Sequence, residues 1–353
     1  MNIKKCRKKI DSIDNKIVAL LNERAQFTLA IGKEKIKAQK AIYAPDREKQ
    51  VLDRIQDLNQ GPMKQEGLTA IYREIMSSSL ALEKPLKIAY LGPQATFTEL
   101  AARKRFGSQV EYFPCGNLAN VFAEVENGHC DYGVVPVENS IEGAVTHTFD
   151  LLVDSDLKIC SQILLEISHN LLSKEPLSRI KKIYSKPEVF GQCRMWLQGN
   201  LPSAQCISTA STTMAAQIAA QERGSACIAS SLAAKVYNLK VLKNDIEDSA
   251  HNITRFFVIS NNDVPPTGKD RTSILFSIKD RVGALHAMLT PFAKNKINLT
   301  KIESRPSKKK AWDYYFFVDF IGHREDVRVK KALAQLEDMC KYLKILGSYP
   351  EIE

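Results

Sequence analysis

Residues 251–259 place two groups capable of chemistry directly before an apolar run. Thr254 offers one hydroxyl proton, and the planar guanidinium of Arg255 can hold a carboxylate through two parallel hydrogen bonds. Four β-forming residues follow, and a turn-forming group begins at Ser260. We therefore predict a short buried strand whose polar end faces a small ligand. In the alternative interpretation, Thr254 only satisfies a backbone group where the strand begins.

Three further polar residues come after strand-like segments in the middle of the chain. Asn139 ends a run that begins at Tyr132, Ser185 ends a shorter run, and Gln192 lies seven residues further on. A strand, a polar cluster and a helix in this order are how α/β domains present ligand-binding groups. We therefore expect a ligand-binding group at the strand end that carries Asn139, with helix capping by Asn139 and Ser140 as the structural alternative.

Several kinds of chemistry are not supported by the residues present. No Gly-x-Gly-x-x-Gly fingerprint follows the first strand-like run, 87–91, so no dinucleotide site is expected. The histidines lack the spacing of metal ligands, and none stands in an obvious relay with a serine or cysteine. The eight cysteines contain no Cys-x-x-Cys pair, which favours reduced thiols over a disulfide framework. We predict neither a metal nor a cofactor.

The net charge of +10 is located at the two ends of the chain. Residues 1–84 carry 17 basic and 11 acidic side chains, residues 85–262 carry 16 and 17, and residues 263–353 carry 17 and 12. A basic excess can attract nucleic acid, anionic lipid or a small anionic substrate. Because no apolar run could span a bilayer and no apolar signal core follows the N-terminal charges, we predict a cytoplasmic protein without a membrane partner.

Three helical patterns fill residues 1–84. Apolar residues recur at helical spacing without a proline or glycine before Gly32, which predicts a first helix over about residues 3–39. A second helix opens at Pro45, and a third covers about residues 66–83. A segment of this size cannot bury so long a helix by itself, so we expect a homodimer or a higher homo-oligomer.

Three cationic residues of the first helix can hold an anion. Arg24 and Lys35 lie on one face, since 11 residues leave them about 20° apart around the axis. Arg7 lies roughly 25 Å before Arg24 along the same axis. One small dianion cannot bridge that gap, so Arg7 would serve a site in the partner chain. The alternative for each charge is a solvated face of an amphipathic helix.

This segment resembles the all-helical chorismate mutase domain. The residues that carry the resemblance are Arg7, Ile10 and Asp14, then Glu23-Arg24, Gly32-Lys33-Glu34-Lys35 and Asp46-Arg47-Glu48. The resemblance implies a buried cationic pocket in an intertwined dimer. Its members would be Arg24, Arg47 and the partner subunit's Arg7 on the two carboxylates of chorismate, Lys35 on the breaking ether oxygen, Glu48 on the hydroxyl, and Ser79 near a carboxylate.

Glu83 stands where many members of that family have glutamine. A carboxylate beside the ether oxygen would repel the negative charge that develops there. We therefore predict that Glu83 works only when protonated, with a pKa raised by burial, and that mutase activity falls as the pH rises through neutrality.

Residues 85–262 resemble prephenate dehydratase. The match lies in Tyr-Leu-Gly-Pro at 90–93, Asp-Tyr-Gly-Val-Val-Pro-Val-Glu-Asn-Ser at 131–140, Tyr-Ser-Lys-Pro at 184–187 and Asn-Ile-Thr-Arg-Phe at 252–256. It implies two α/β lobes with a cleft between them, where prephenate loses carbon dioxide and hydroxide to give phenylpyruvate. Thr254 would be the donor nearest the departing hydroxyl, with Asn139, Ser185 and Gln192 positioning the substrate and Arg255 on a carboxylate. Lys186 departs from the histidine that is usual there.

A polar, proline-rich linker around residues 263–268 precedes a third segment. Its predicted order of strand, helix, two strands, helix and strand is the ferredoxin-like plan. It resembles the ACT regulatory domain of prephenate dehydratases, which implies a phenylalanine site at a dimer interface, lined by Gly283, Ala284, Leu285, Asn298, Leu299, Glu303, Ser304, Arg305 and Pro306. His286 departs from the commoner aliphatic or aromatic residue. The alternative is a dimerisation module without a ligand. The run Lys308, Lys309 and Lys310 is predicted to be a solvated loop.

The three segments together predict a multidomain fold: an all-helical domain over 1–84, a two-lobed α/β domain over 85–262 and a ferredoxin-like βαββαβ domain over 271–350. The resemblances, in this order, imply a bifunctional enzyme of phenylalanine biosynthesis that acts on chorismate and prephenate, is inhibited by phenylalanine and has no nucleic-acid partner. The alternative is an ACT-containing ligand-sensing regulator that binds nucleic acid through its basic N-terminus. That alternative requires a short recognition helix, whereas the predicted first helix is long.

Overall fold

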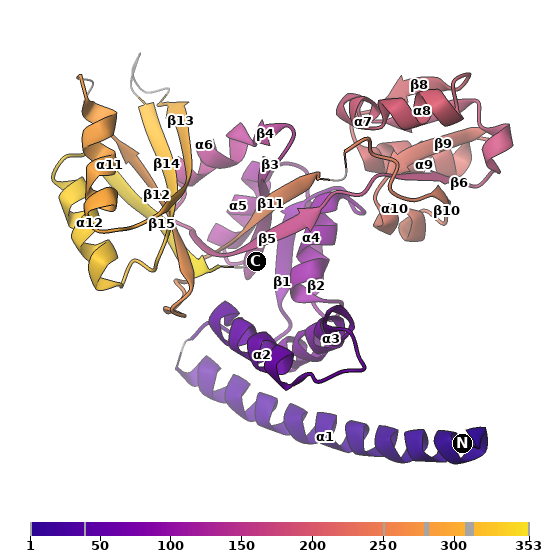
Figure 1. Ribbon diagram of the computed structural model, residues 1–353, viewed down its shortest axis with the longest axis horizontal. Helices are drawn as coiled ribbons and strands as arrows, with labels where there is room; N and C mark the ends of the chain where they lie inside the picture. The colour runs from indigo at the N-terminus through magenta and orange to yellow at the C-terminus, as the bar shows by residue number, and fades with distance from the viewer. Residues whose placement is uncertain (1, 39, 250, 279–281, 308–313, 352–353) are drawn as a thin grey trace. The chain divides into compact units, whose positions relative to one another are not determined.

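The computed structural model describes residues 2–38, 40–249, 251–278, 282–307 and 314–351 (Figure 1). The lysines 308–310, predicted to form a solvated loop, lie outside these residues. The chain forms two compact units, one of Met1–Leu86 with Phe106–Glu111 and one of Lys87–Arg105 with Tyr112–Glu353. Within the described residues, no helix combines the length and the apolar character needed to cross a bilayer.

The first unit is helical, as the spacing of its apolar residues predicts. Helix α1 begins after Asn2, whose side chain accepts the backbone N–H of Lys4 at 3.0 Å. Helix α2 has Pro45 at its first position, where a missing N–H costs nothing. The elements are α1 Ile3–Lys37, α2 Pro45–Leu58 and α3 Gln65–Glu83.

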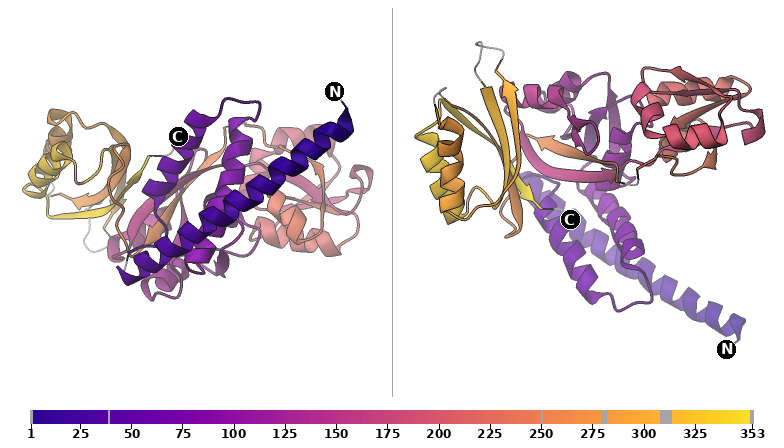
Figure 2. Two further views of the ribbon diagram at one scale, coloured as in Figure 1. Left: turned by 90° about the horizontal axis from the view of Figure 1, so that it is seen from below. Right: turned by 45° about the horizontal axis from the view of Figure 1, so that its top comes forward.

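The N-terminal part of α1 projects beyond α2 and α3 (Figure 2). Its apolar face is uncovered, since Ile3, Ile10, Ile13 and Ile17 are 69%, 55%, 54% and 46% exposed. Burial of each such side chain is worth about 1.5–3 kcal/mol. A row of this kind is typical of a surface that associates with another chain.

The first lobe of the second unit is built on a mixed sheet in the order β2-β1-β3-β11-β5, with β4 paired to β3. Strand β11 is central and buried on both faces, which accounts for its continuous apolar run from Phe256 to Ile259. The elements are β1 Lys87–Leu91, α4 Phe97–Phe106, β2 Glu111–Cys115, α5 Leu118–Glu126, β3 Tyr132–Asn139, β4 Gly143–Ala144, α6 Thr146–Asp154, β5 Lys158–Glu166 and β11 Ile253–Ser260.

The second lobe is inserted between β5 and β11 and has its own sheet in the order β10-β6-β9-β7-β8. The chain therefore enters and leaves this lobe at the polar ends of two strands of the first lobe. Its elements are β6 Asn170–Ser173, the 3-10 turn Leu177–Arg179, β7 Lys182–Ser185, α7 Pro187–Gln192, α8 Arg194–Asn200, β8 Gln205–Ser208, α9 Thr212–Gln221, β9 Ser225–Ala229, α10 Ser231–Val236 and β10 Lys240–Lys243.

The third domain confirms the predicted ferredoxin-like order, with a sheet arranged β13-β14-β12-β15. Its Phe317 and Tyr349 join Phe257 of the first lobe in one apolar core. Strand β15 meets β5 so closely that a Cβ on Gly347 would lie 2.1 Å from the carbonyl oxygen of Ile159. The elements are β12 Asp270–Ser277, α11 Ala284–Lys294, β13 Leu299–Pro306, β14 Tyr314–Ile321, α12 Val327–Glu337 and β15 Tyr342–Pro350.

Candidate active site

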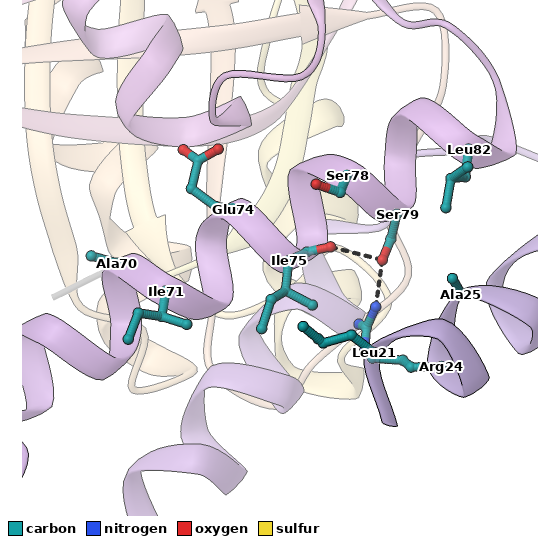
Figure 3. Close-up of a pocket in the computed structure, with 10 residues that line it drawn as sticks. All are labelled: Leu21, Arg24, Ala25, Ala70, Ile71, Glu74, Ile75, Ser78, Ser79 and Leu82. Atoms are coloured by element: carbon teal, nitrogen blue, oxygen red, sulfur yellow. Dashed lines mark hydrogen bonds between the residues drawn. The ribbon is translucent and has the colours of Figure 1, made fainter. Parts of the chain in front are cut away.

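Two residues predicted for the first site meet between α1 and α3. Arg24 Nη1 donates to Ser79 Oγ, and Ser79 Oγ donates to the carbonyl of Ile75 at 2.8 Å (Figure 3). A pocket of about 590 Å³ opens beside them. Its lining is mostly apolar and consists of Leu21, Arg24, Ala25, Ala70, Ile71, Glu74, Ile75, Ser78, Ser79 and Leu82.

A second pair lies further along the same two helices. Lys35 Nζ is 2.7 Å from Glu83 Oε2 and 2.7 Å from the carbonyl oxygen of Ile42. Gly32 allows this approach, because a Cβ there would lie only 3.0 Å from the Cα of Glu83. The Glu83 carboxylate therefore competes with any ligand for the ammonium of Lys35.

The other residues predicted for this site lie at the start of α1 and on α2. Arg7 is exposed on the projecting part of α1, and Arg47 is exposed on α2, where its Nη1 donates to Gln50 Oε1 at 3.2 Å. Glu48 is half-buried on α2. The described contacts thus join two of the four predicted cations, Arg24 and Lys35, to residues of α3.

The ends of β3 and β11 bring Asn139 and Thr254 into contact. The two residues pair in antiparallel register, and Asn139 Nδ2 donates to Thr254 Oγ1 at 2.8 Å. Asn139 Oδ1 accepts the backbone N–H groups of Ile141 and Glu142 at 2.9 and 3.0 Å, which fixes the orientation of its amide. Since Thr254 Oγ1 accepts this hydrogen bond, its own proton remains for another acceptor.

Gln192, at the end of α7 in the second lobe, joins this group. Its Oε1 accepts from Asn252 Nδ2 at 3.0 Å, and its Nε2 donates to Glu142 Oε1 in the first lobe at 3.1 Å. A pocket of about 440 Å³ opens here, lined by Ile141, Glu142, Glu188, Gly191, Gln192, Glu247, Asp248, Ser249 and Asn252. The described lining contains four carboxylates and no lysine or arginine, so an anionic ligand there depends on neutral amide and hydroxyl donors.

Arg255 points away from this group. Its Nε donates to Gln162 Oε1 at 2.9 Å, its Nη1 pairs with Asp319 Oδ2 at 2.5 Å, and its Nη2 donates to Tyr349 Oη at 2.9 Å. Successive residues of a strand face opposite sides of the sheet, so Arg255 and Thr254 cannot share one face. The guanidinium of Arg255 therefore donates to residues of the first lobe and the third domain, and it does not face a ligand beside Thr254.

Ser185 also lies outside the hydrogen bonds of this group. It is fully buried at the end of β7, and its hydroxyl donates to the carbonyl of Ile228 at 2.8 Å. The neighbouring Lys186 pairs with Glu188 at 3.4 Å. The pKa of the Glu188 carboxyl is lowered first by its own backbone N–H and further by this lysine.

The residues predicted to bind an effector lie on two elements of the third domain. Gly283 has a φ of +76° and precedes α11, in which Ala284 is buried and Leu285 is 40% exposed. Asn298 is exposed just before β13, the edge strand of the sheet. Along β13, Leu299, Glu303 and Arg305 are half-buried, while Ser304 and Pro306 are exposed.

The half-buried side of β13 is tied to the first lobe. Arg305 Nη2 lies 3.0 Å from Asp150 Oδ1 on α6. Lys301 Nζ lies 2.8 Å from Glu138 Oε1, and Glu138 immediately precedes Asn139. The strand predicted to carry the effector residues is thus joined by two ion pairs to the domain that holds Thr254.

Asn252 and His169 were not among the predicted site residues, yet both belong to the hydrogen-bonded group. Asn252 Oδ1 accepts from Asn139 Nδ2 at 2.7 Å, and His169 Nε2 lies 2.7 Å from Gln192 Oε1. Asn252 could have been found from its position two residues before Thr254 on an extended segment. His169 has no such signal, because its partner lies 23 residues away.

Comparison with known proteins covers all three parts of the chain. The family models for chorismate mutase type II, prephenate dehydratase and the ACT domain match residues 6–84, 88–264 and 272–338. The bifunctional chorismate mutase/prephenate dehydratases of Aquifex aeolicus and Pseudomonas aeruginosa are 50% and 44% identical, over 99% of this chain and 98% of each relative.

Among solved structures, the prephenate dehydratase of Arthrobacter aurescens in complex with L-Phe is similar, with 34% identity and a TM-score of 0.71 over 75% of this chain and 90% of that one. The three matched segments follow one another in the order that the sequence predicts. The chain has the chorismate mutase and prephenate dehydratase activities, and it belongs to the family of bifunctional chorismate mutase/prephenate dehydratases.

Proposed function

We propose that the dehydratase reaction takes place where Asn139, Gln192, Asn252 and Thr254 meet, with Thr254 as the proton donor. The observation that carries this proposal is the hydrogen bond from Asn139 Nδ2 to Thr254 Oγ1. In this hydrogen bond, Thr254 Oγ1 accepts from a side chain of the protein. The threonine proton is then available to the hydroxyl that leaves prephenate.

In this reaction, these residues have to hold prephenate in place and stabilise the charge that develops on the leaving oxygen. The bond between the ring and its carboxylate breaks, and its electron pair forms a ring double bond. The carbon–oxygen bond across the ring breaks in turn, so that carbon dioxide and hydroxide leave. Thr254 donates to the oxygen on which negative charge develops. Because the ring becomes aromatic, a weak acid is sufficient as the donor.

Two substitutions at Thr254 test this role. Thr254→Val keeps the shape of the side chain without the donor, and it should lower dehydratase kcat by roughly 100-fold or more. Thr254→Ser keeps the hydroxyl and should retain much of the turnover. Mutase turnover measured on the same preparations reports whether the chain has folded. Wild-type dehydratase kcat in Thr254→Val would remove Thr254 from the mechanism.

For the mutase reaction, we place chorismate in the first unit beside Arg24 and Lys35. Arg24 is held by Ser79, and both cations project from α1 toward α3. In the substrate complex, the ether oxygen would take over the donor that Lys35 gives to Glu83. The rearrangement is unimolecular, so trapping a reactive conformation and stabilising its charge are sufficient, without a cofactor.

We further propose that the enzyme is a homodimer or a higher homo-oligomer in which the partner subunit's Arg7 completes this pocket. The uncovered isoleucine row of α1 supports such an assembly. The domain boundaries 1–84, 85–262 and 271–350 and the cytoplasm as the location remain predictions.

We propose that phenylalanine inhibits the dehydratase through the third domain, and the L-Phe complex of the Arthrobacter relative supports this. In the register of β3 with β11, Glu138 lies opposite Arg255, one position away from Asn139 opposite Thr254. The sheet thus presents the reactive pair on one face and Glu138 with Arg255 on the other.

The third domain holds that second face through Lys301 on Glu138 and Asp319 on Arg255. Any shift of β13 or β14 on effector binding would therefore reach the backbone that carries Asn139 and Thr254. Because Arg305 also ties β13 to Asp150, a movement of this strand cannot leave the first lobe unaffected.

A further inference from the structure

The polarity of the hydrogen bonds in the dehydratase site can be followed from one residue to the next. It begins at backbone N–H groups, since those of Ile141 and Glu142 occupy Asn139 Oδ1. Asn139 Nδ2 is then the donor to Asn252 Oδ1. The amide nitrogen of Asn252 is therefore the group that donates to Gln192 Oε1. The backbone thus fixes the orientation of the Asn139 and Asn252 amides, and Asn252 supplies one of the donors to Gln192 Oε1.

His169 lies at the end of this chain of hydrogen bonds. Its Nε2 is 2.7 Å from Gln192 Oε1, and because that oxygen can only accept, Nε2 must carry the proton. The Nδ1 of His169 is buried and has no hydrogen-bond partner among the described residues. The ring therefore serves as a single fixed donor to Gln192.

The surroundings of His169 hold the ring in place. It is 2% exposed, and the ring of Phe97 meets it edge-on with centroids 5.6 Å apart. Its backbone N–H donates to Glu247 Oε2 at 2.8 Å. Burial lowers the pKa of the imidazole, which favours the neutral ring. The described side-chain hydrogen bond of His169 goes to Gln192, so we expect any influence of His169 on the reaction to pass through Gln192.

We propose that His169 is a positioning residue of the dehydratase, which keeps the oxygen of Gln192 turned inward and its Nε2 turned toward the substrate. This inference rests on the proposed site at Asn139, Gln192, Asn252 and Thr254. Gln192 Nε2 now donates to Glu142 at the edge of the pocket, and prephenate would replace Glu142 as its acceptor. A turned amide would present its oxygen to an anionic substrate and repel it.

Two substitutions separate the hydrogen bond from the packing of the ring. His169→Phe keeps a planar ring beside Phe97 but removes the donor. His169→Gln can place an N–H where Nε2 lies. We expect His169→Phe to raise KM for prephenate roughly tenfold with a smaller change in kcat, as befits one lost hydrogen bond. His169→Gln should recover KM to within about threefold of the wild type.

Gln192→Ala completes a double-mutant cycle, with mutase turnover of the full chain as the control for folding. In the Gln192→Ala background, His169→Phe should have almost no further effect on KM. Unchanged KM in His169→Phe, equal defects in His169→Phe and His169→Gln, or additive effects of His169→Phe and Gln192→Ala would each overturn the inference. Wild-type kinetics in Gln192→Ala would instead show that the proposed site itself is wrong.

Discussion

We predict that the ion pair between Arg255 and Asp319 contributes both to the free energy of unfolding and to inhibition by phenylalanine. Both side chains are buried, at 9% and 6% exposure, and they join β11 of the first lobe to β14 of the third domain. Asp319→Leu would leave the buried guanidinium without its ion-pair partner, and the Glu138 carboxylate, which acts on Arg255 through space, is itself paired with Lys301. Breaking one side of such a pair costs about 3–5 kcal/mol. The remaining contacts of Arg255 with Gln162 and Tyr349 are neutral and cannot replace the charge.

Arg255→Met combined with Asp319→Leu is the matched control, because it removes both charges and keeps most of the buried volume. Its free energy of unfolding should recover most of the loss, less about 0.5–1.5 kcal/mol for each hydrogen bond left unmade. Urea unfolding followed by circular dichroism measures the wild type, Asp319→Leu and the double variant, with Arg255→Met alone as a third variant. Equal stability of Asp319→Leu and the wild type would refute the idea that this pair is a closed, buried contact.

The same variants test the regulatory role. Phenylalanine should inhibit the dehydratase of the double variant at clearly higher concentrations than the wild type, because the third domain has lost its hold on β11. Full inhibition at the wild-type concentration would exclude this route. A raised KM for prephenate in Arg255→Met, with inhibition unchanged, would instead support the carboxylate contact that the sequence predicts for Arg255.

Three further outcomes follow from other contacts. Gly347→Ala should lower the free energy of unfolding by roughly 3 kcal/mol or more, because the added Cβ would collide with the Ile159 carbonyl. Urea unfolding measures this change. A change within about 0.5 kcal/mol, as at an ordinary surface position, would contradict the close contact of β15 with β5. Because the Glu83 carboxylate competes for the ammonium of Lys35, Glu83→Gln should raise the mutase rate measured with chorismate; a rate equal to that of the wild type would contradict this competition. Burial lowers the pKa of His169 against the opposing effects of Gln192 and Glu247, so below about pH 6.5 the unfolded chain binds a proton that the folded chain does not. Stability should therefore decrease as the pH falls through that range, and less steeply in His169→Phe; identical slopes would contradict a buried neutral ring.

The helices of the first unit could be predicted well from the sequence, because their signals are local. Apolar residues at helical spacing, Pro45 at a helix start and the absence of breakers before Gly32 are enough to outline α1 and α2. The placement of Arg24 and Lys35 on one face also follows from the period of a helix, and both residues face α3 in the structure. Helix geometry alone relates positions that are 11 residues apart.

The direction of the Arg255 side chain could not be predicted in this way. An alternating strand reveals its two faces, but β11 is apolar on both sides after Arg255, since one sheet face is covered by the third domain. Its neighbours Asp319 and Tyr349 lie 64 and 94 residues away. Strand alternation puts Thr254 and Arg255 on opposite faces, but only the packing of the third domain decides which of the two faces it covers.

The dehydratase group itself was predicted only in part for a similar reason. Asn139 and Thr254 are 115 residues apart, and their contact depends on the register of β3 with β11, which no local pattern specifies. Asn252 and His169 are ordinary polar residues in sequence. Their roles arise from the polarity of hydrogen bonds that begin at the backbone of Ile141 and Glu142.

The most direct measurement supplies chorismate to Thr254→Ala and follows prephenate and phenylpyruvate together. If the two reactions use separate sites within one chain, and Thr254 serves only the second, chorismate should be consumed at the wild-type rate while prephenate accumulates and phenylpyruvate does not form. Phenylpyruvate at the wild-type rate would show that Thr254 is not the donor. Loss of both reactions would show that the substitution damages the fold, and the assignment of Thr254 to the chemistry would lose its support.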